Sequence, residues 1–175
     1  MLTTVALGFL VLTLHQANSQ ECIDRKKYEA QVNACCDFPQ FFTSPSNYQR
    51  QACQEELKNM ALDRDNQIVC AVKCQMEKQG ILEKDRVDVK KSNELTKHLD
   101  EETRDVMARL IEMCVRITNE QRSHLTKTQY KCSFFAYGFL LCLTEKMRAN
   151  CPDKYWKSGG ICDKWDKLGY CDDGN

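Results

Sequence analysis

The sequence predicts an all-α fold, a compact helical bundle bridged by disulfide bonds, and three observations support this prediction. Apolar residues recur at helical spacing in several long segments. No Asn-Gly or Asp-Gly turn joins two runs in which apolar and polar residues alternate, so the usual hairpin signals are missing. The chain also has twelve cysteines in 175 residues, an even number that is typical of a disulfide framework.

The N-terminal residues 1–19 are predicted to form a signal peptide. An apolar run, MLTTVALGFLVLTL, is followed by Ala17-Asn18-Ser19, which fits the small-x-small pattern of a cleavage site. The usual basic residues ahead of such a run are missing, but the run is too short to span a membrane comfortably. Residues 20–175 are then expected to form one secreted domain.

All twelve cysteines lie after the predicted signal peptide, and a secreted domain of this kind uses them in disulfides. They are Cys22, Cys35, Cys36, Cys53, Cys70, Cys74, Cys114, Cys132, Cys142, Cys151, Cys162 and Cys171. Only His98 and His124 remain after cleavage, and no CxxC pair occurs. We therefore expect no metal site and no cofactor.

Five helical segments are predicted in order along the chain. They cover residues 22–36, 47–60, 65–79, 87–117 and 130–150. Ser46 can cap the second segment and Gly80 can end the third, whereas Asp100 can cap the long amphipathic part of the fourth. Residues 152–175 are poor in helix formers and predict a C-terminal extension, a disulfide-pinned tail that folds back over the domain.

The fifth segment is predicted to be the central helix. Ten consecutive residues, 134–143, are apolar or small and carry no charge. A helix that is apolar on all sides is a buried one, and a run of this length suits a core helix better than a membrane span. Gly138 within the run costs about 1 kcal/mol of helix propensity relative to alanine. Either a close helix approach or room for a ligand would explain this glycine.

The cysteine spacings indicate that disulfide bonds join one helix to several others. Cys70 and Cys74 are four residues apart and share a helix face, yet disulfide geometry requires a closer approach of their Cβ atoms. They must therefore bond to different partners. The adjacent cysteines Cys35 and Cys36 must also bond to different partners. The same holds for the cysteines of the central helix, because they point to different sides of it.

The ordered spacing of the later cysteines resembles that of a known family. Cys70-x3-Cys74 is followed by Cys114 after 39 residues, Cys132 after 17, Cys142 after 9 and Cys151 after 8, then directly by Pro152 and later by Cys162 and Cys171. From about Cys53 to Cys171 this order is similar to that of the insect odorant-binding proteins, in their cysteine-rich "Plus-C" branch. The proline and the two further cysteines are the mark of that branch.

The resemblance implies a bundle of about six or more helices around an apolar cavity. It implies a small hydrophobic ligand, such as an odorant or a pheromone, with a chemosensory receptor or a second copy of the chain as candidate partners. It also implies a bridge between Cys53 and Cys74, and bridges from Cys70 and Cys114 to the central helix. For those two, the family spacing favours Cys142 and Cys151, while position within the helix leaves Cys132 and Cys142 equally open.

The candidate ligand-binding residues are apolar side chains of the central helix and of the helix before it, because thioethers and rings adapt to varied ligands. They are Phe134, Phe135, Phe139, Leu140, Leu143, Met107, Leu110, Ile111 and Met113, with Tyr137 as the hydroxyl that orients a polar end. Phe38, Phe41 and Phe42 are candidates for a flap, and Trp156 or Trp165 for a lid. Plain core packing would explain the same apolar residues.

Charge and motifs exclude several other functions. The chain has 25 basic and 25 acidic residues, so it offers no basic footprint for nucleic acid or an anionic membrane. The Cys35-Cys36 pair resembles that of disulfide-rich phospholipases, but CCDFPQF lacks the catalytic histidine. No GxSxG motif occurs, and cysteines in an oxidised, even set are poor nucleophiles. The charged run 83–91, EKDRVDVKK, and the two histidines are expected to be solvated surface.

The sequence therefore predicts a non-enzymatic, extracellular carrier that solubilises small hydrophobic molecules and does not insert stably into a membrane. The alternative is a secreted disulfide-rich protein that binds a protein partner through an exposed apolar surface. The two differ in structure, because a carrier has an interior pocket and the alternative has an apolar patch on its surface.

Overall fold

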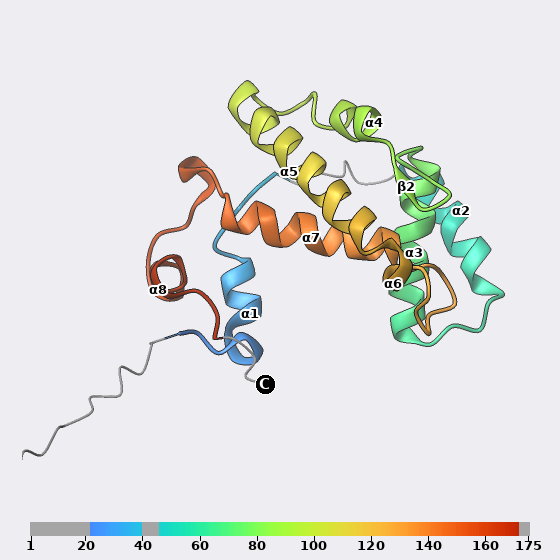
Figure 1. The fold of residues 1–175 in the computed structure, drawn as a ribbon, viewed down its shortest axis with the longest axis horizontal. Coiled ribbons are helices and arrows are strands. Elements are labelled where there is room, and N and C mark those ends of the chain that lie inside the picture. Colours follow the sequence, from blue (N-terminus) through green and yellow to red (C-terminus); the bar gives the residue numbers. More distant parts are fainter. Residues whose placement is uncertain (1–21, 40–45, 172–175) are drawn as a thin grey trace, which may run out of the picture.

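Helices carry most of the described part of the chain, residues 22–39 and 46–171 of this computed structural model (Figure 1). They are α1 (Arg25–Asn33), α2 (Asn47–Lys58), α3 (Arg64–Lys78), α4 (Val89–Glu94), α5 (Glu101–Glu120), α6 (Arg122–Leu125), α7 (Phe135–Ala149) and α8 (Ile161–Leu168), with a short 3-10 helix η1 (Asp153–Tyr155). The predicted all-α, disulfide-bridged fold is confirmed. The signal peptide 1–19 and the flap residues Phe41 and Phe42 lie outside the described residues.

Local sequence signals set where several helices begin and end. The Ser46 hydroxyl accepts a hydrogen bond from the Gln49 backbone N–H at 3.2 Å and caps α2, as predicted. The Asp100 carboxylate caps α5 in the same way. Gly80 follows α3 with a φ of +73°, a left-handed conformation that ends the helix at the predicted residue.

The charged run 83–91 is largely exposed to solvent, as expected, but together with Leu82 it also forms a hairpin that was not predicted. The hairpin consists of β1 (Leu82–Glu83) and β2 (Arg86–Val87), with Leu82 opposite Val87. Its two-residue turn, Lys84-Asp85, has φ values of 47° and 56°, the left-handed values that such a turn requires at both positions. Neither residue is glycine, so the usual turn signal was absent from the sequence.

The predicted fifth segment begins later than expected. Residues 130–134 form bends and a turn, and α7 starts at Phe135. The short helix α6 precedes them and was not predicted. A Cβ atom on Gly138 would lie 3.2 Å from Leu125 Cδ2, so the close approach of α6 explains this glycine. The tail also differs from the prediction, because it contains η1 and the helix α8.

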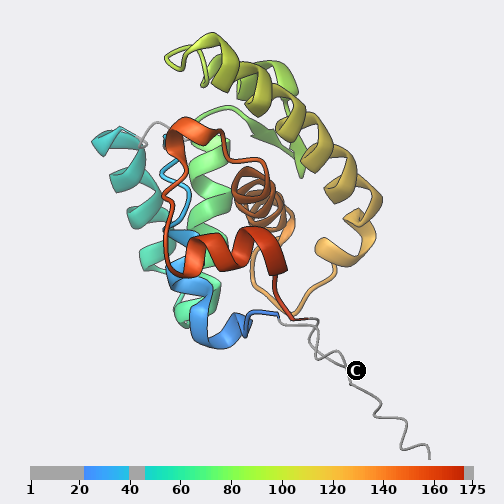
Figure 2. The ribbon, with the colours of Figure 1, turned by 90° about the vertical axis from the view of Figure 1, so that its left-hand side faces the viewer.

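The centre of the bundle is α7, which α5 crosses on one side and α3 contacts at one end (Figures 1 and 2). Phe135, Ala136, Phe139 and Leu143 are spaced to share one face of α7, and all four are buried. This face packs into one apolar core with residues of α3, β1 and α5. The predicted central position of this segment is confirmed, but the expected burial on all sides is not, because Leu141 on another face is 45% exposed.

All twelve cysteines form six disulfides, as predicted. The pairs are Cys22–Cys171, Cys35–Cys162, Cys36–Cys151, Cys53–Cys74, Cys70–Cys132 and Cys114–Cys142. The implied bridge between Cys53 and Cys74 is confirmed. For the bridges to the central segment, the choice of Cys142 and Cys151 is wrong, and the alternative, Cys132 and Cys142, is right. Cys151 lies beyond the end of α7 and reaches the segment after α1 instead.

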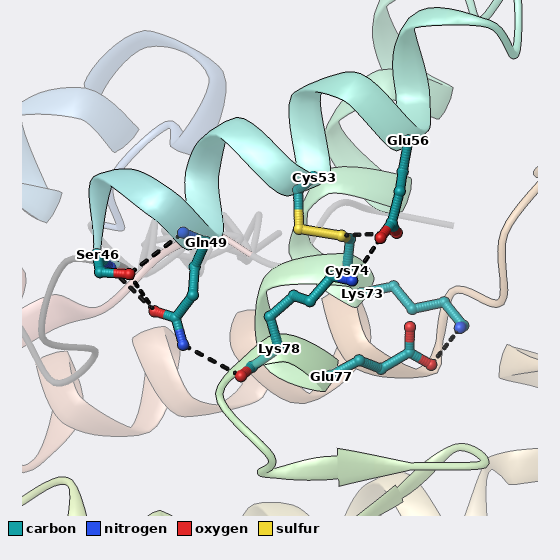
Figure 3. The surroundings of a disulfide bond; sticks show 8 residues. All are labelled: Ser46, Gln49, Cys53, Glu56, Lys73, Cys74, Glu77 and Lys78. Atoms are coloured by element: carbon teal, nitrogen blue, oxygen red, sulfur yellow. Dashed lines mark hydrogen bonds and ion pairs between the residues drawn. A yellow bond between two sulfur atoms is a disulfide. The ribbon is translucent and has the colours of Figure 1, made fainter.

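A disulfide and several polar contacts together hold α2 against α3 (Figure 3). Cys53 on α2 bonds to Cys74 on α3, with Cα atoms 5.8 Å apart. The Gln49 side chain, which completes the capping box of α2, also donates to the Lys78 backbone carbonyl at 3.1 Å. The ammonium of Lys78 pairs in turn with Glu56 on α2. These contacts fix the register of α2 on α3.

The C-terminal tail is docked at two places. Tyr170 pairs with Ile23 beside α1, and Trp156 pairs with Cys36 in an isolated β-bridge. The helix α8 packs against α1, and Figure 2 shows it just below the end of α7. The predicted tail that folds back over the domain is present, and two of its cysteines, Cys162 and Cys171, hold it there.

Asp100 is the residue that anchors η1 to the start of α5. Its carboxylate accepts hydrogen bonds from Lys154 Nζ at 2.7 Å and from Tyr155 Oη at 3.2 Å, besides those from Thr103. The hydrogen bond from Lys154, followed by those from Thr103, holds the pKa of the Asp100 carboxyl well below its ordinary range. Thr103 is buried beneath this anchor.

We expect Asp100→Asn to lower the thermal unfolding midpoint by a few degrees at pH 7. Because the folded-state pKa lies below the unfolded value of about 3.9, the stabilisation is present above that pH and is lost as the pH falls below about 4. The difference between wild type and variant should therefore shrink in acid. The control is Asp105→Asn, an exposed carboxylate on the same helix. An equal difference at pH 7 and pH 2 would contradict the assignment.

Candidate functional site

Six of the ten candidate ligand-binding residues come together in the apolar core. They are Met107, Leu110, Ile111, Phe135, Phe139 and Leu143, and all six are buried. Leu82 and Ile81 from the hairpin segment pack in the same cluster. The structure therefore assembles the predicted residues of α5 and α7 into one continuous apolar interior.

The other four candidates, Met113, Phe134, Tyr137 and Leu140, are partly exposed. Phe134 and Tyr137 belong to an aromatic group at the start of α7. The Phe134 ring stacks on Tyr130 at 5.2 Å between centroids and meets the Tyr137 ring edge-on at 5.2 Å. Tyr137, the expected orienting hydroxyl, therefore lies among rings at one end of the helix, apart from the buried cluster.

A second face of α7 borders a groove against α1. Its lining residues are Arg25, Glu29 and Asn33 from α1 and Leu141, Cys142, Thr144, Glu145 and Arg148 from α7, around a volume of about 230 Å³. An adjoining cleft of about 130 Å³ shares Asn33, Thr144 and Arg148 and adds Cys36, Phe38 and Met147. We call these two spaces together the α1–α7 groove.

The inner end of the α1–α7 groove reaches the apolar core. Phe38 and Met147 line the groove and also pack against the core cluster. Phe38, a predicted flap residue, is partly buried and lies 5.4 Å from the Tyr155 ring, measured between centroids. At the outer end Leu141 is 45% exposed although it lies in the most apolar part of α7. The groove thus has apolar residues at both ends.

Disulfides hold the two walls of the groove in place. Cys36, just after α1, bonds to Cys151, just after α7, and both flank the inner end of the groove. Cys142 lines the groove and is bonded to Cys114 on α5. One covalent bond, Cys36–Cys151, thus joins the two walls at the inner end of the groove, and a second anchors the α7 wall to α5.

The rim of the groove is a small charge network centred on Arg25. Its guanidinium lies 3.2 Å from Glu29 Oε1 and 2.8 Å from Glu145 Oε1. The hydrogen bonds to Glu29 and then to Glu145 raise the pKa of Arg25 above its already high ordinary value. Arg25 thereby bridges the two glutamates across the groove, one from each wall.

Arg148 is the charged residue that lies deepest in the groove, only 8% exposed. Its Nη1 donates to Asn33 Oδ1, and its Nη2 lies 4.0 Å from Glu145 Oε1. The guanidinium carbon lies 5.4 Å from the Trp165 ring centre and 5.3 Å from that of Tyr170. Burial raises the pKa of Tyr170.

The predicted lid residues belong to this aromatic group of the tail. The Trp156 and Trp165 ring centroids lie 5.9 Å apart, and Trp165 in turn packs beside Tyr170. Trp165 and Tyr170 lie against the Arg148 guanidinium, and Trp156 lies beside Trp165. The only sequence signal for Arg148 was its spacing of seven residues from Leu141 and three from Glu145, which places the three on one face of the helix.

His98 and His124 are exposed, as predicted. Within residues 22–39 and 46–171, no group of three or more His, Cys, Asp or Glu side chains is arranged to hold a metal ion. In the same ranges no helix combines the length and the apolar character that crossing a membrane requires.

No protein-family model and no curated protein matches this chain. The resemblance to the odorant-binding proteins therefore rests on the cysteine order and stays a prediction. The six disulfides fit an oxidising compartment, such as the extracellular space, better than the cytosol.

Proposed function

We propose that this protein is a secreted, non-enzymatic carrier of small hydrophobic molecules, of the odorant-binding type. The observation that carries the proposal is the distribution of apolar residues around α7. Phe135, Phe139 and Leu143 pack in the core, whereas Leu141 on another face lines the α1–α7 groove. Leu141 is therefore an apolar residue of α7 that the core does not bury, and it lies where a ligand has space.

The carrier mechanism needs only burial of apolar surface. Removing the apolar surface of a ligand from water contributes about 25 cal/mol per Å². Leu141, Phe38 and Met147 supply apolar contacts along the groove, and the disulfides keep its walls apart without a ligand. A site that is already formed loses less conformational entropy on binding than one that must close around its ligand.

The experiment that tests the proposal is a fluorescence titration of an apolar naphthylamine probe into the oxidised protein. We expect saturable binding of about one probe per chain, and loss of binding after the disulfides are reduced and alkylated. Monodisperse, oxidised protein that shows no saturable binding would contradict the carrier function and favour the alternative, a protein partner.

A matched pair of variants tests whether the groove is the binding site. Leu141 lines the groove and is 45% exposed, whereas Leu168 on α8 is 39% exposed and is not among the groove residues. We expect Leu141→Ala to weaken probe binding by about three- to tenfold through lost apolar contact. Leu168→Ala should leave it unchanged. Equal effects of the two variants would place the probe elsewhere.

A further inference from the structure

We propose that the α1–α7 groove selects ligands with a carboxylate group, and that Arg148 is the residue that holds the carboxylate. The inference rests on the proposed carrier function and deepens it, because it names the chemical class of the ligand: a small amphiphilic anion such as a medium-chain alkanoate. The neutral analogue with a hydroxyl group is the competing ligand against which the preference is measured.

The hydrogen bonds of Arg148 are incomplete for a buried guanidinium. An arginine has five N–H donors, and this one is 8% exposed, so water reaches it poorly. Its Nη1 is satisfied by Asn33, but its buried Nε has no hydrogen-bond partner among the described residues. The distance of 4.0 Å from Nη2 to Glu145 Oε1 is too long for a hydrogen bond. Nε is thus the Arg148 nitrogen that is both buried and unpaired among the described residues, and leaving such a donor unpaired is costly.

The neighbouring glutamates, Glu29 and Glu145, accept no hydrogen bond from Arg148, because both are already bonded to Arg25. Glu145 lies 2.8 Å from Arg25 and Glu29 lies 3.2 Å from it. The rim of the groove is thus paired internally, with one arginine between two carboxylates. Of the two arginines in the groove, Arg148 is the one with a buried N–H donor that has no hydrogen-bond partner among the described residues.

The two rings stacked against Arg148 carry further buried polar atoms without a partner. They are the Trp165 Nε1 and the Tyr170 hydroxyl oxygen. Both groups can donate a hydrogen bond, as can Arg148 Nε. Neither ring is among the residues that line the groove. The acceptor that a ligand in the groove can bring to Arg148 is a carboxylate, because its two oxygens accept from two guanidinium N–H groups at once.

The rest of the groove suits the apolar part of such a ligand. Leu141 lies at one end, and Phe38 and Met147 lie toward the core, with Arg148 lining both spaces. Volumes of about 230 Å³ and about 130 Å³ accommodate a short chain rather than a large lipid. A ligand with its head group at Arg148 can extend its chain along either apolar end.

The test is calorimetric titration of the oxidised protein with octanoate and, separately, with octanol at pH 7. We expect octanoate to bind about 10- to 100-fold more tightly, the range for a hydrogen-bonded charge pair. Lengthening the alkanoate from hexanoate to decanoate should tighten binding by up to about fourfold for each CH₂ that fits in the groove. Octanoate that binds no better than octanol would overturn the inference, because Arg148 would then give a carboxylate no advantage over a hydroxyl.

Two variants show whether Arg148 causes the preference. Arg148→Lys keeps the positive charge but removes Nε and the forked geometry. Asn33→Asp places a protein carboxylate against Arg148 and occupies its donors, at an exposed position that tolerates substitution. Either variant should lower the octanoate-to-octanol affinity ratio at least tenfold. The control is Arg116→Lys, an exposed arginine on α5 that is outside the groove, and it should leave the ratio unchanged.

The outcomes separate this inference from the carrier function. Binding of the naphthylamine probe without an octanoate preference would overturn the inference and leave the carrier function in place. Octanoate binding that depends on Arg148, without probe binding, would support the inference and contradict a carrier of neutral molecules. A preference that survives both variants would also overturn the inference. If Arg148→Lys fails to fold, Asn33→Asp alone decides.

Discussion

Replacing Phe139 with alanine is expected to destabilise the protein by about 3–5 kcal/mol. The Phe139 ring is 0% exposed and lies in the middle of the core that α7 forms with α5 and the hairpin. Its removal loses the transfer free energy of a phenyl ring and leaves a cavity that rigid neighbours cannot fill. The disulfide between Cys114 and Cys142 restricts this relaxation because it fixes α5 to α7.

The measurement is the free energy of unfolding by denaturant, with the disulfides intact in both proteins. Leu141→Ala is the control, because Leu141 is two residues away on the same helix and 45% exposed. Its cost should stay within about 0.5 kcal/mol. A similarly small cost for Phe139→Ala, together with tighter probe binding, would mean that the ring lines a ligand cavity instead of filling the core.

Removing the Cys114–Cys142 disulfide, with both residues replaced by alanine, is the second change with a large expected effect. The bridge closes a loop of 28 residues in sequence separation and joins α5 to α7. Loss of the loop-closure constraint on the unfolded chain corresponds to about 3–4 kcal/mol. Both helices contribute to the core, so we expect faster amide hydrogen exchange across α5 and α7.

The matched comparison is the double alanine variant of Cys22 and Cys171, which removes a bridge near the two ends of the described chain. Here faster exchange should stay confined to the neighbourhood of Ile23 and Tyr170, because the α5–α7 core keeps its own bridge. If the two variants show the same exchange pattern, the bridges act only through the unfolded state, and the local role assigned to Cys114–Cys142 is wrong.

The helix boundaries are features that could be predicted from short stretches of sequence. Ser46, Asp100 and Gly80 were assigned from the sequence to the caps and the stop that the structure shows. A capping side chain acts on the backbone two or three residues away, so its effect can be recognised without knowing the fold. The apolar run 134–143 likewise predicted the central helix, although the burial on all sides that such a run suggests does not extend to Leu141, which is 45% exposed.

The hairpin and the helix of the tail are features that short stretches of sequence did not predict. Lys84 and Asp85 adopt left-handed conformations that their own preferences disfavour. They do so because Leu82 and Val87 on either side pack into the core. The helix α8 forms in a segment with two glycines just ahead of it, because α1 provides a surface and Cys162 holds it there. In both cases tertiary contacts outweigh local propensity.

The candidate site divides in the same way. The sequence identified α5 and α7 as the source of the apolar interior, since their side chains follow helical spacing. It did not identify the α1–α7 groove, because Asn33 and Arg148 are 115 residues apart and meet only in the folded structure, in which Cys36 is also bonded to Cys151.

By itself, the sequence determined that this protein is helical, that its cysteines are paired, and that one helix is buried at its centre. These properties follow from composition and from interactions within one or two helical turns. Only the tertiary structure decided how the cysteines pair and where a second face of α7 lies against α1. It also decided that Arg148 is buried there with its Nε lacking a hydrogen-bond partner among the described residues. Those properties depend on contacts between distant segments, and the spacing of residues along one chain does not encode distances between its folded parts.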